Sequence, residues 1–152
     1  MEIRQYSADE VLQNKNEMIE MLRDNYRINI PEHAVSSDFC TDKFSKLVLH
    51  MLEGNAFVWV ALKNGDLAGF AWGFLFEHYN EKWLHINHVF VKKEHRQTGI
   101  ARLLMNALWD WARNNGIAAL DLYVRNTNDA AVSLYTKMGF EPQKIYMTRK
   151  AL

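Results

Sequence analysis

The sequence has very little cysteine and no long apolar run. Cys40 is the single cysteine among 152 residues, so neither a disulfide within the chain nor a cysteine zinc site can form. A chain without disulfides suits a reducing compartment, and residues 1–5 lack the apolar core of a signal peptide. The longest apolar run, residues 67–76, is about half a membrane span. We therefore expect a cytoplasmic protein that does not enter a membrane.

Proline and glycine are also scarce, at 2 and 7 residues. This composition excludes collagen-like and low-complexity chains. Disorder is excluded as well, because 5 Trp, 6 Tyr and 8 Phe are available to pack into a core. A length of 152 residues suits one domain that needs neither a disulfide nor a metal for stability. We expect a single domain over residues 1–152.

Net charge is zero, which argues against a general nucleic-acid binder, since such proteins usually carry a strongly basic domain. The charges are nevertheless distributed unevenly. Residues 92–152 hold 10 basic and 5 acidic side chains, whereas residues 1–91 hold 8 basic and 13 acidic ones. This asymmetry predicts two ligands with different charge preferences, although solvated surface charges distributed by chance give the same pattern.

Hydrophobic periodicity predicts alternating strands and helices. A capping box at Ser7 and Glu10 begins a helix that we expect to run to about Ile28. Further helices are expected to begin at Asp38, Ile100 and Asp129, and strands are expected at residues 2–5, 57–62, 67–76, 83–91, 118–124 and 144–149. This order predicts an α/β fold with helices on both faces of the sheet. The helical crossover makes strands 83–91 and 118–124 parallel neighbours.

The loop between the strand at 83–91 and the next helix is the first candidate for chemistry. It reads Arg96-Gln97-Thr98-Gly99-Ile100-Ala101. Small residues let a ligand approach the backbone closely, and loop amides together with a helix N-terminus make an anion site. Lys92, Lys93 and Arg102 add positive charge nearby. The motifs of P-loop NTPases and of dinucleotide-binding Rossmann domains are both missing.

A second motif lies about 30 residues downstream, in residues 128–140. Together the two segments resemble the GCN5-related N-acetyltransferase (GNAT) family. Its phosphate motif, R/Q-x-x-G-x-G/A, is matched by Arg96, Gly99 and Ala101. Its later signature, N-x-x-A-x-x-L-Y-x-x-x-G-F, is matched at each named position by Asn128, Ala131, Leu134, Tyr135, Gly139 and Phe140. The resemblance in motifs covers about residues 83–142.

The resemblance implies a mixed, mostly antiparallel central sheet with helices on both faces and a splayed parallel strand pair. It also implies acetyl-CoA as cosubstrate, with no metal. The expected cofactor-binding residues are Val89, Phe90, Val91, Arg96, Gln97, Thr98, Gly99, Ile100, Ala101, Arg102, Asn128, Ala131 and Tyr135. The backbone of Val89 and Val91 would pair with the pantetheine arm as an added strand does. A bulge in that strand would open the slot for the thioester.

The catalytic roles that the resemblance implies begin with Tyr135, beside the thioester sulfur. A phenol of pKa about 10 stays protonated at neutral pH and can donate to the leaving thiolate. An amide near Phe90 would polarise the carbonyl. Some relatives carry a base on the fourth strand, where this sequence has His85 and no acid. His88 and Glu77 are the further candidates. Strand alternation places His85 and His88 on opposite faces unless a bulge intervenes.

The acceptor pocket of this family lies between the first helices and the loop before the fourth strand. The expected substrate-binding residues are Tyr26, Glu77, Tyr79, Trp83 and Asn87, in which aromatic rings stack on a ligand and a carboxylate holds an ammonium. Alternating aromatics in a strand are equally explained as core. Polyamine, amino sugar, amino acid and peptide acceptors remain open. Trp109 is a candidate interface residue for a homodimer.

We expect an N-acetyltransferase acting on a primary amine of a small molecule, with no nucleic-acid or membrane partner. The alternatives are a protein or peptide N-acetyltransferase, and a GNAT-like module that binds CoA without turnover. A zinc site at His85, His88 and His95 is disfavoured, because a strand points the first two to opposite faces and no further ligand completes the set.

Overall fold

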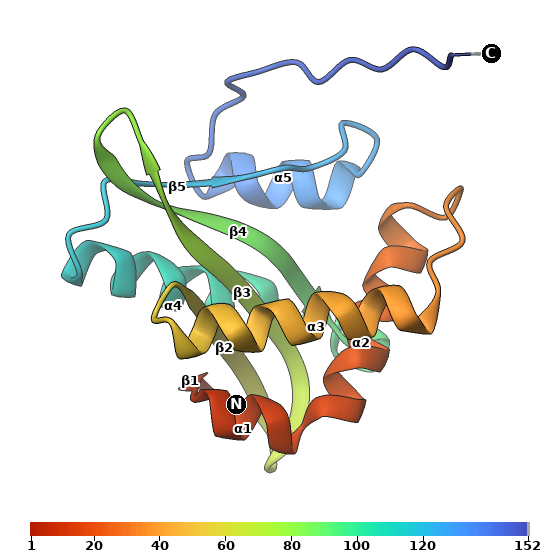
Figure 1. Cartoon of the computed structure of the whole chain (residues 1–152), viewed down its shortest axis with the longest axis vertical. Coiled ribbons are helices and arrows are strands. Elements are labelled where there is room, and N and C mark those ends of the chain that lie inside the picture. The colour runs from red at the N-terminus through yellow and green to blue at the C-terminus, as the bar shows by residue number, and fades with distance from the viewer. Residues whose placement is uncertain (152) are drawn as a thin grey trace.

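A five-stranded sheet forms the centre of the computed structural model, which describes residues 1–151 (Figure 1). Its strands are β1 (Glu2–Tyr6), β2 (Ala56–Lys63), β3 (Asp66–His78), β4 (Glu81–Val91) and β5 (Ala119–Leu122). They lie in the order β1-β2-β3-β4-β5. The first three pairings are antiparallel, and β4 pairs with β5 in parallel. The predicted mixed sheet with one parallel pair is confirmed.

Helices cover both faces of the sheet, as predicted. The helices are α1 (Ala8–Gln13), α2 (Lys15–Asn29), α3 (Ser37–Leu52), α4 (Ile100–Asn114) and α5 (Asp129–Lys137). In Figure 1, α3 crosses in front of the strands and α4 lies behind them. A short 3-10 turn, η1 (Lys93–His95), follows β4. Among the described residues, no helix combines the length and the apolar character needed to cross a membrane.

The two faces of the sheet carry separate hydrophobic cores, because successive strand residues point to opposite faces. In β2, Val58 and Val60 join the core that contains Phe44 of α3. Trp59, between them, joins the core that contains Leu104 of α4. Tyr135 of α5 packs against this second core.

The helix expected from Ser7 to about Ile28 is divided in two at Asn14. The capping box is present, since Ser7 accepts from the Glu10 amide and the Glu10 side chain accepts from the Ser7 amide. The Asn14 side chain donates to the Glu10 carbonyl oxygen at 2.8 Å, and its backbone lies at φ −103° and ψ 19°. This local hydrogen bond competes with the helical ladder, which the periodicity of apolar residues does not register.

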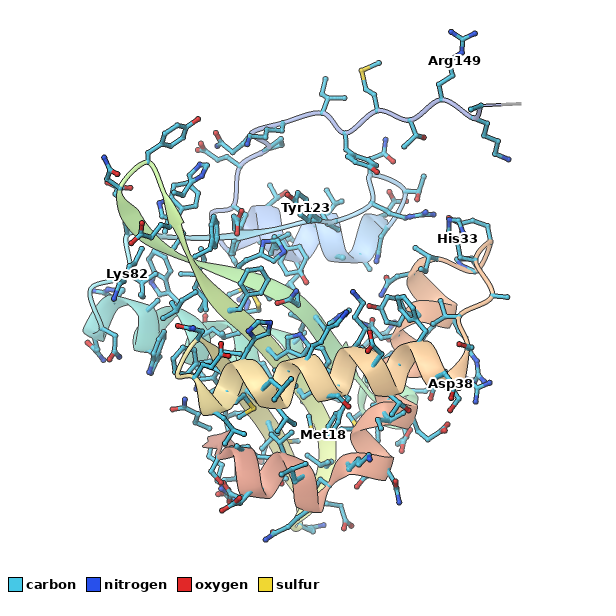
Figure 2. The ribbon with its side chains drawn as sticks, in the orientation of Figure 1. Met18, His33, Asp38, Lys82, Tyr123 and Arg149 are labelled. Atoms are coloured by element: carbon cyan, nitrogen blue, oxygen red, sulfur yellow. The ribbon has the colours of Figure 1, made fainter. Side chains whose placement is uncertain are left out.

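The strand expected at residues 144–149 is absent. Residues 141–151 have no regular secondary structure, and Ile145, Tyr146 and Met147 are more than 80% exposed. The tail extends away from the sheet in Figure 1, and Arg149 lies near its far end in Figure 2. A strand is stable only with a partner, so the apolar residues of the tail do not by themselves form one.

A bulge interrupts the pairing of β3 with β4. Trp72 pairs with His88 and Gly73 pairs with Ile86, so Asn87 has no partner on β3. The two strands approach closely here: a Cβ at Gly73 would lie 2.7 Å from the carbonyl oxygen of His85. Because one extra residue sits in β4, the side chains before and after it change their alternation.

Beyond the bulge, β4 separates from β5. Their pairing runs from Trp83 with Ala119 to Ile86 with Leu122. β4 continues to Val91, whereas β5 ends at Leu122. The last five residues of β4 therefore have no pairing with β5. This is the splayed parallel pair that the resemblance to the family implied.

Candidate functional site

The loop before α4 has the backbone of an anion site. Gln97 lies at φ 61° and Gly99 at φ 83°, both in the left-handed region. Gly99 is the N-cap residue of α4, and no side chain caps that helix end. The first amides of α4 thus have no side-chain cap, which is the arrangement that anion-binding helix ends use. A Cβ placed on Gly99 would meet nothing within 4 Å, so the space above the loop is open.

The side chains of this loop hold its shape. Arg96 donates from Nε to the Val91 carbonyl oxygen at 2.9 Å, and its guanidinium lies 5.5 Å from the centre of the Phe90 ring. Thr98 donates to the His95 carbonyl oxygen at 2.5 Å. These contacts connect the loop to the end of β4. The exposed Arg102 lies in the first turn of α4.

Tyr135 lies on α5 and packs into the second core. Its ring lies at 5.8 Å and 64° to that of Phe140, centre to centre. Burial raises the pKa of Tyr135 to about 12, since the phenolate is the form that desolvation disfavours. The hydroxyl therefore stays protonated throughout the neutral and alkaline range in which an amine is reactive.

A pocket of about 340 Å³ lies between α3, β3, β4 and the residue after β5. It is lined by Tyr26, Lys43, Lys46, Leu47, His50, Ala56, Trp72, Gly73, Phe74, His85, Ile86, Asn87, His88 and Tyr123. Tyr123, labelled in Figure 2, directly follows β5. The bulge at Asn87 explains why this pocket contains both His85 and His88. His85 pairs with Phe74 and His88 with Trp72, and these two residues of β3 share a face.

His85 forms a short contact with a carboxylate from the neighbouring strand. Its Nδ1 lies 2.8 Å from Oδ1 of Asp121, its partner in the β4–β5 register. A carboxylate only accepts hydrogen bonds, so Nδ1 must carry the proton, and the neutral ring has its lone pair on Nε2. The His85 side chain is 13% exposed, and Phe74 and Tyr123 flank its ring.

Asp121 was not among the candidates from the sequence. Strand 83–91 contains no acid, and the acid that contacts His85 comes from β5 instead. An isolated acid in the apolar run of residues 117–124 was the available signal. That signal is useful only when the residue of β4 that pairs with Asp121 is known, and a single sequence does not fix this cross-strand register.

His88 lies in a chain of hydrogen-bonded side chains that crosses from α5 to β4. Asn128 donates to Asn29 at 3.0 Å, Asn29 donates to Asn25 at 2.5 Å, and Asn25 approaches His88 Nδ1 at 3.1 Å. An amide nitrogen only donates, so Nδ1 of His88 accepts and the proton sits on Nε2, which lies 3.4 Å from the Tyr26 hydroxyl oxygen. Both ring nitrogens of His88 are thus engaged.

The environment of His88 opposes its protonation. Burial lowers the pKa of His88 to about 3, and the positive charge of Lys43 adds to this effect. His88 is therefore neutral at physiological pH and has no free lone pair for a proton. We assign His88 the role of positioning the side chains to which it is hydrogen-bonded, and His85 stays the candidate base.

Three of the expected substrate-binding residues lie outside the pocket. Glu77, Tyr79 and Trp83 lie at the hairpin end of β3 and β4, where Tyr79 is 84% exposed and Trp83 donates to Glu81 at 3.1 Å. The β3–β4 hairpin extends these strands beyond the pocket. Tyr26 and Asn87 do line it.

The expected cofactor contacts of α5 are occupied in part by the chain itself. The Asn128 side chain accepts from the Ala131 amide at 3.2 Å and caps α5. Its amide donates to Asn29. Contact of Asn128 and Ala131 with a pantetheine arm stays a prediction. No cluster of three or more His, Cys, Asp or Glu side chains arranged for a metal ion occurs within residues 1–151.

Comparison with known proteins decides the family. The sequence model described as "Acetyltransferase (GNAT) family" matches residues 15–140, a span that contains both motifs and the pocket. The chain belongs to the GNAT family. The loop before α4, the bulged β4 and the α5 segment all lie within the matched residues.

Two curated relatives illustrate the range of this GNAT protein's similarities. Streptothricin acetyltransferase of Streptomyces lavendulae is 42% identical over 77 residues, which cover 51% of this chain and 40% of that protein. N-acetyltransferase 8 of Homo sapiens is 29% identical over 109 residues, which cover 70% and 48%. The chain thus spans less than half the length of these relatives.

Solved structures show the same fold at low sequence identity. A possible acetyltransferase from Clostridium difficile has a TM-score of 0.80 at 19% identity, covering 99% of this GNAT protein and 97% of that chain. An aminoglycoside N-acetyltransferase in complex with CoA has a TM-score of 0.70 at 20% identity, covering 99% and 95%.

The buried His88 makes the stability of this GNAT protein depend on pH. Its pKa falls from an ordinary 6.5 to about 3 on folding, so between these values the unfolded chain binds the extra proton. Stability is therefore complete above pH 6.5 and is lost as pH falls, by about 2 kcal/mol between pH 7.5 and pH 5. His88→Gln should remove this component in urea unfolding at the two pH values.

His33→Gln is the matched control, since His33 is exposed and lies outside the pocket. It should keep the wild-type difference between the two pH values. An NMR titration of the His88 ring gives a second readout that needs no variant. Protonation of that ring near pH 6.5 in the folded protein would contradict the prediction.

Proposed function

We propose that this GNAT protein transfers an acetyl group from acetyl-CoA to a primary amine of a small molecule in the cytoplasm. What carries the proposal is the position of β4 between two sites. On one side, the last residues of β4 lie where β4 has separated from β5, and they lead into the loop before α4. On the other side His85 lines a pocket and contacts Asp121. A transferase needs a donor and an acceptor site that meet, and β4 borders both.

The residues present fit acetyl-CoA. The amides around Gln97 to Ala101 would hold the pyrophosphate, helped by Arg96 and Arg102. The backbone of Val89, Phe90 and Val91, which has no pairing with β5, would hold the pantetheine arm. When bound, acetyl-CoA supplies an activated acetyl thioester.

Two side chains of this protein would move protons. His85 takes a proton at Nε2 from the acceptor ammonium, directly or through a water molecule, and Asp121 keeps the proton of Nδ1 in place. Tyr135 donates its phenol proton, or a strong hydrogen bond, to the leaving sulfur. A backbone amide near Phe90 would donate to the carbonyl oxygen, where negative charge develops. The nitrogen–carbon bond forms as the carbon–sulfur bond breaks, and the second proton that the nitrogen loses passes to the Tyr135 phenolate or to solvent.

The acceptor pocket supports a small molecule over a protein or peptide. Its volume of about 340 Å³ lies at the lower end of the range of small-molecule sites. The contact of His85 with Asp121 also supports turnover over a module that only binds CoA, because binding alone has no need of an oriented base. Thiol release measured across a panel of amines is the direct test of the reaction.

Acetyl-CoA should stabilise this protein against heat. A ligand at 100 times its Kd adds about 2.7 kcal/mol, which raises Tm by about 5–10 °C in a chain of this size. Thermal unfolding with and without acetyl-CoA measures the shift. An unchanged Tm at millimolar acetyl-CoA would contradict the proposed cosubstrate.

Gly99→Val should reduce that shift, because the side chain enters the open space above the anion loop and strains a residue at φ +83°. Gly116→Val is the matched control. Gly116 also has a positive φ, +70°, and open space around it, but it follows the C-terminal end of α4. The control should carry the same backbone strain and keep the full stabilisation by acetyl-CoA. An equal loss in both variants would exclude a specific role for the loop.

A further inference from the structure

The charged side chains that line the pocket are basic. Lys43, Lys46 and His50 come from one side of α3, and no carboxylate of the described residues is part of the pocket lining. The acidic residue expected to hold an ammonium, Glu77, lies at the hairpin instead. A pocket built for a polycationic amine would need the opposite charge on this wall.

The two lysines differ in how far their charge is already balanced. Lys46 forms an ion pair with Asp42 at 3.0 Å, and His50 lies 3.7 Å from Glu53. Lys43 has no carboxylate within 4.0 Å among residues 1–151, and its ammonium lies 5.3 Å from the centre of the Phe39 ring. Lys43 is half-buried and is close enough to His88 to oppose its protonation. It is the uncompensated positive charge of the pocket.

Another part of the pocket lining has the other polarity. His85 lines the pocket, and its Nδ1 lies 2.8 Å from the carboxylate of Asp121. An ammonium group is stabilised beside His85, and an anion is stabilised beside Lys43. A ligand that carries both charges would match these two parts of one lining.

From this polarity we infer that the acceptor is an amine that also bears a carboxylate, an amino acid or a close derivative, and that Lys43 selects it by binding the carboxylate. This inference rests on the proposed function and names its substrate class. It separates this protein from relatives whose names specify aminoglycosides. Lys46 has a supporting role, because Asp42 shares its charge.

Matched amine pairs that differ in one anionic group test the inference. We would measure thiol release with lysine against cadaverine, phenylalanine against phenethylamine, and phosphoethanolamine against ethanolamine. Because hydrogen bonds to charged groups contribute strongly, kcat/KM should favour each carboxylate-bearing partner by about tenfold or more. A preference confined to the phosphate pair would overturn the carboxylate assignment, and a preference for the decarboxylated amines would overturn the inference as a whole.

Lys43→Gln should remove the preference, so that the ratio of kcat/KM within each carboxylate pair falls to about one. Lys63→Gln is the matched control. It removes the same charge from a side chain that is exposed at the β2–β3 hairpin. An undiminished preference in Lys43→Gln would show that Lys43 does not select the substrate.

Calorimetric binding of lysine and cadaverine to the protein with CoA gives a readout that needs no turnover. Tighter binding of lysine, lost in Lys43→Gln, supports the inference even where thiol release is slow. Equal binding, or no binding, of the two ligands overturns it. Failure of the proposed function has a different signature, namely no thiol release with any amine together with no stabilisation by acetyl-CoA.

Discussion

Tyr135→Phe is expected to lower kcat by about 100-fold or more, because a positioned proton donor typically contributes at least that much. The phenyl ring keeps the packing against Phe140, so the fold and the stabilisation by acetyl-CoA should be retained. The pKa of Tyr135 is raised to about 12 by burial. The ratio of wild-type to variant kcat should therefore stay constant from pH 6.5 to pH 9.5, since the phenol is protonated throughout.

The measurement is thiol release at saturating acetyl-CoA as a function of pH. Tyr146→Phe, in the exposed tail, is the control that removes an equivalent hydroxyl and should behave as wild type. Wild-type turnover in Tyr135→Phe would exclude the acid role. A loss that grows or shrinks with pH in this range would mean that the hydroxyl titrates, which its burial does not allow.

His85→Gln is expected to lower kcat/KM by about 100-fold at neutral pH, and the deficit should shrink as pH rises. The base is needed because an alkyl ammonium of pKa about 10 is almost fully protonated at neutral pH. At higher pH the solvent supplies free amine, and the base matters less. The pH profile of kcat/KM for the best amine of the panel measures this convergence.

Asp121→Asn distinguishes a base held by its partner from a histidine that merely fills space. An amide can donate to Nδ1, which favours the tautomer with the proton on Nε2 and removes the lone pair that accepts the amine proton. The variant should lose activity in the same direction as His85→Gln with little change in stability. His33→Gln should match wild type, and profiles parallel to wild type in both pocket variants would eliminate His85 as the base.

Local sequence was sufficient for the parts of the site whose backbone one segment determines. Gly99 and its neighbours form the uncapped start of α4, and the residues from Asn128 to Phe140 form α5 and its turn. The parts assembled from distant segments were harder. Asp121 reaches His85 across 36 residues, and Lys43 enters the pocket because α3 packs on the sheet.

The differences between expectation and structure have physical causes. Glu77, Tyr79 and Trp83 lie away from the pocket because β3 and β4 continue to pair as far as His78 with Glu81, where the sequence predicts a loop. The strand at residues 144–149 was predicted from composition, but no partner strand fixes the tail. The basic pocket also changes the interpretation of the acidic N-terminal half, because its acids include Asp42, which balances the pocket cation Lys46 from outside.

The unpaired Asn87 decides which face of the sheet the end of β4 presents to the pocket. With Asn87 outside the ladder, two histidines three positions apart reach the same cavity. A regular ladder through Asn87 would turn His88 and the residues after it to the α4 side of the sheet. Deleting Asn87 would remove the bulge and leave both histidines on the pocket face, because they would then be two positions apart. For this strand, the conformation of one backbone position therefore determines whether a second histidine enters the pocket.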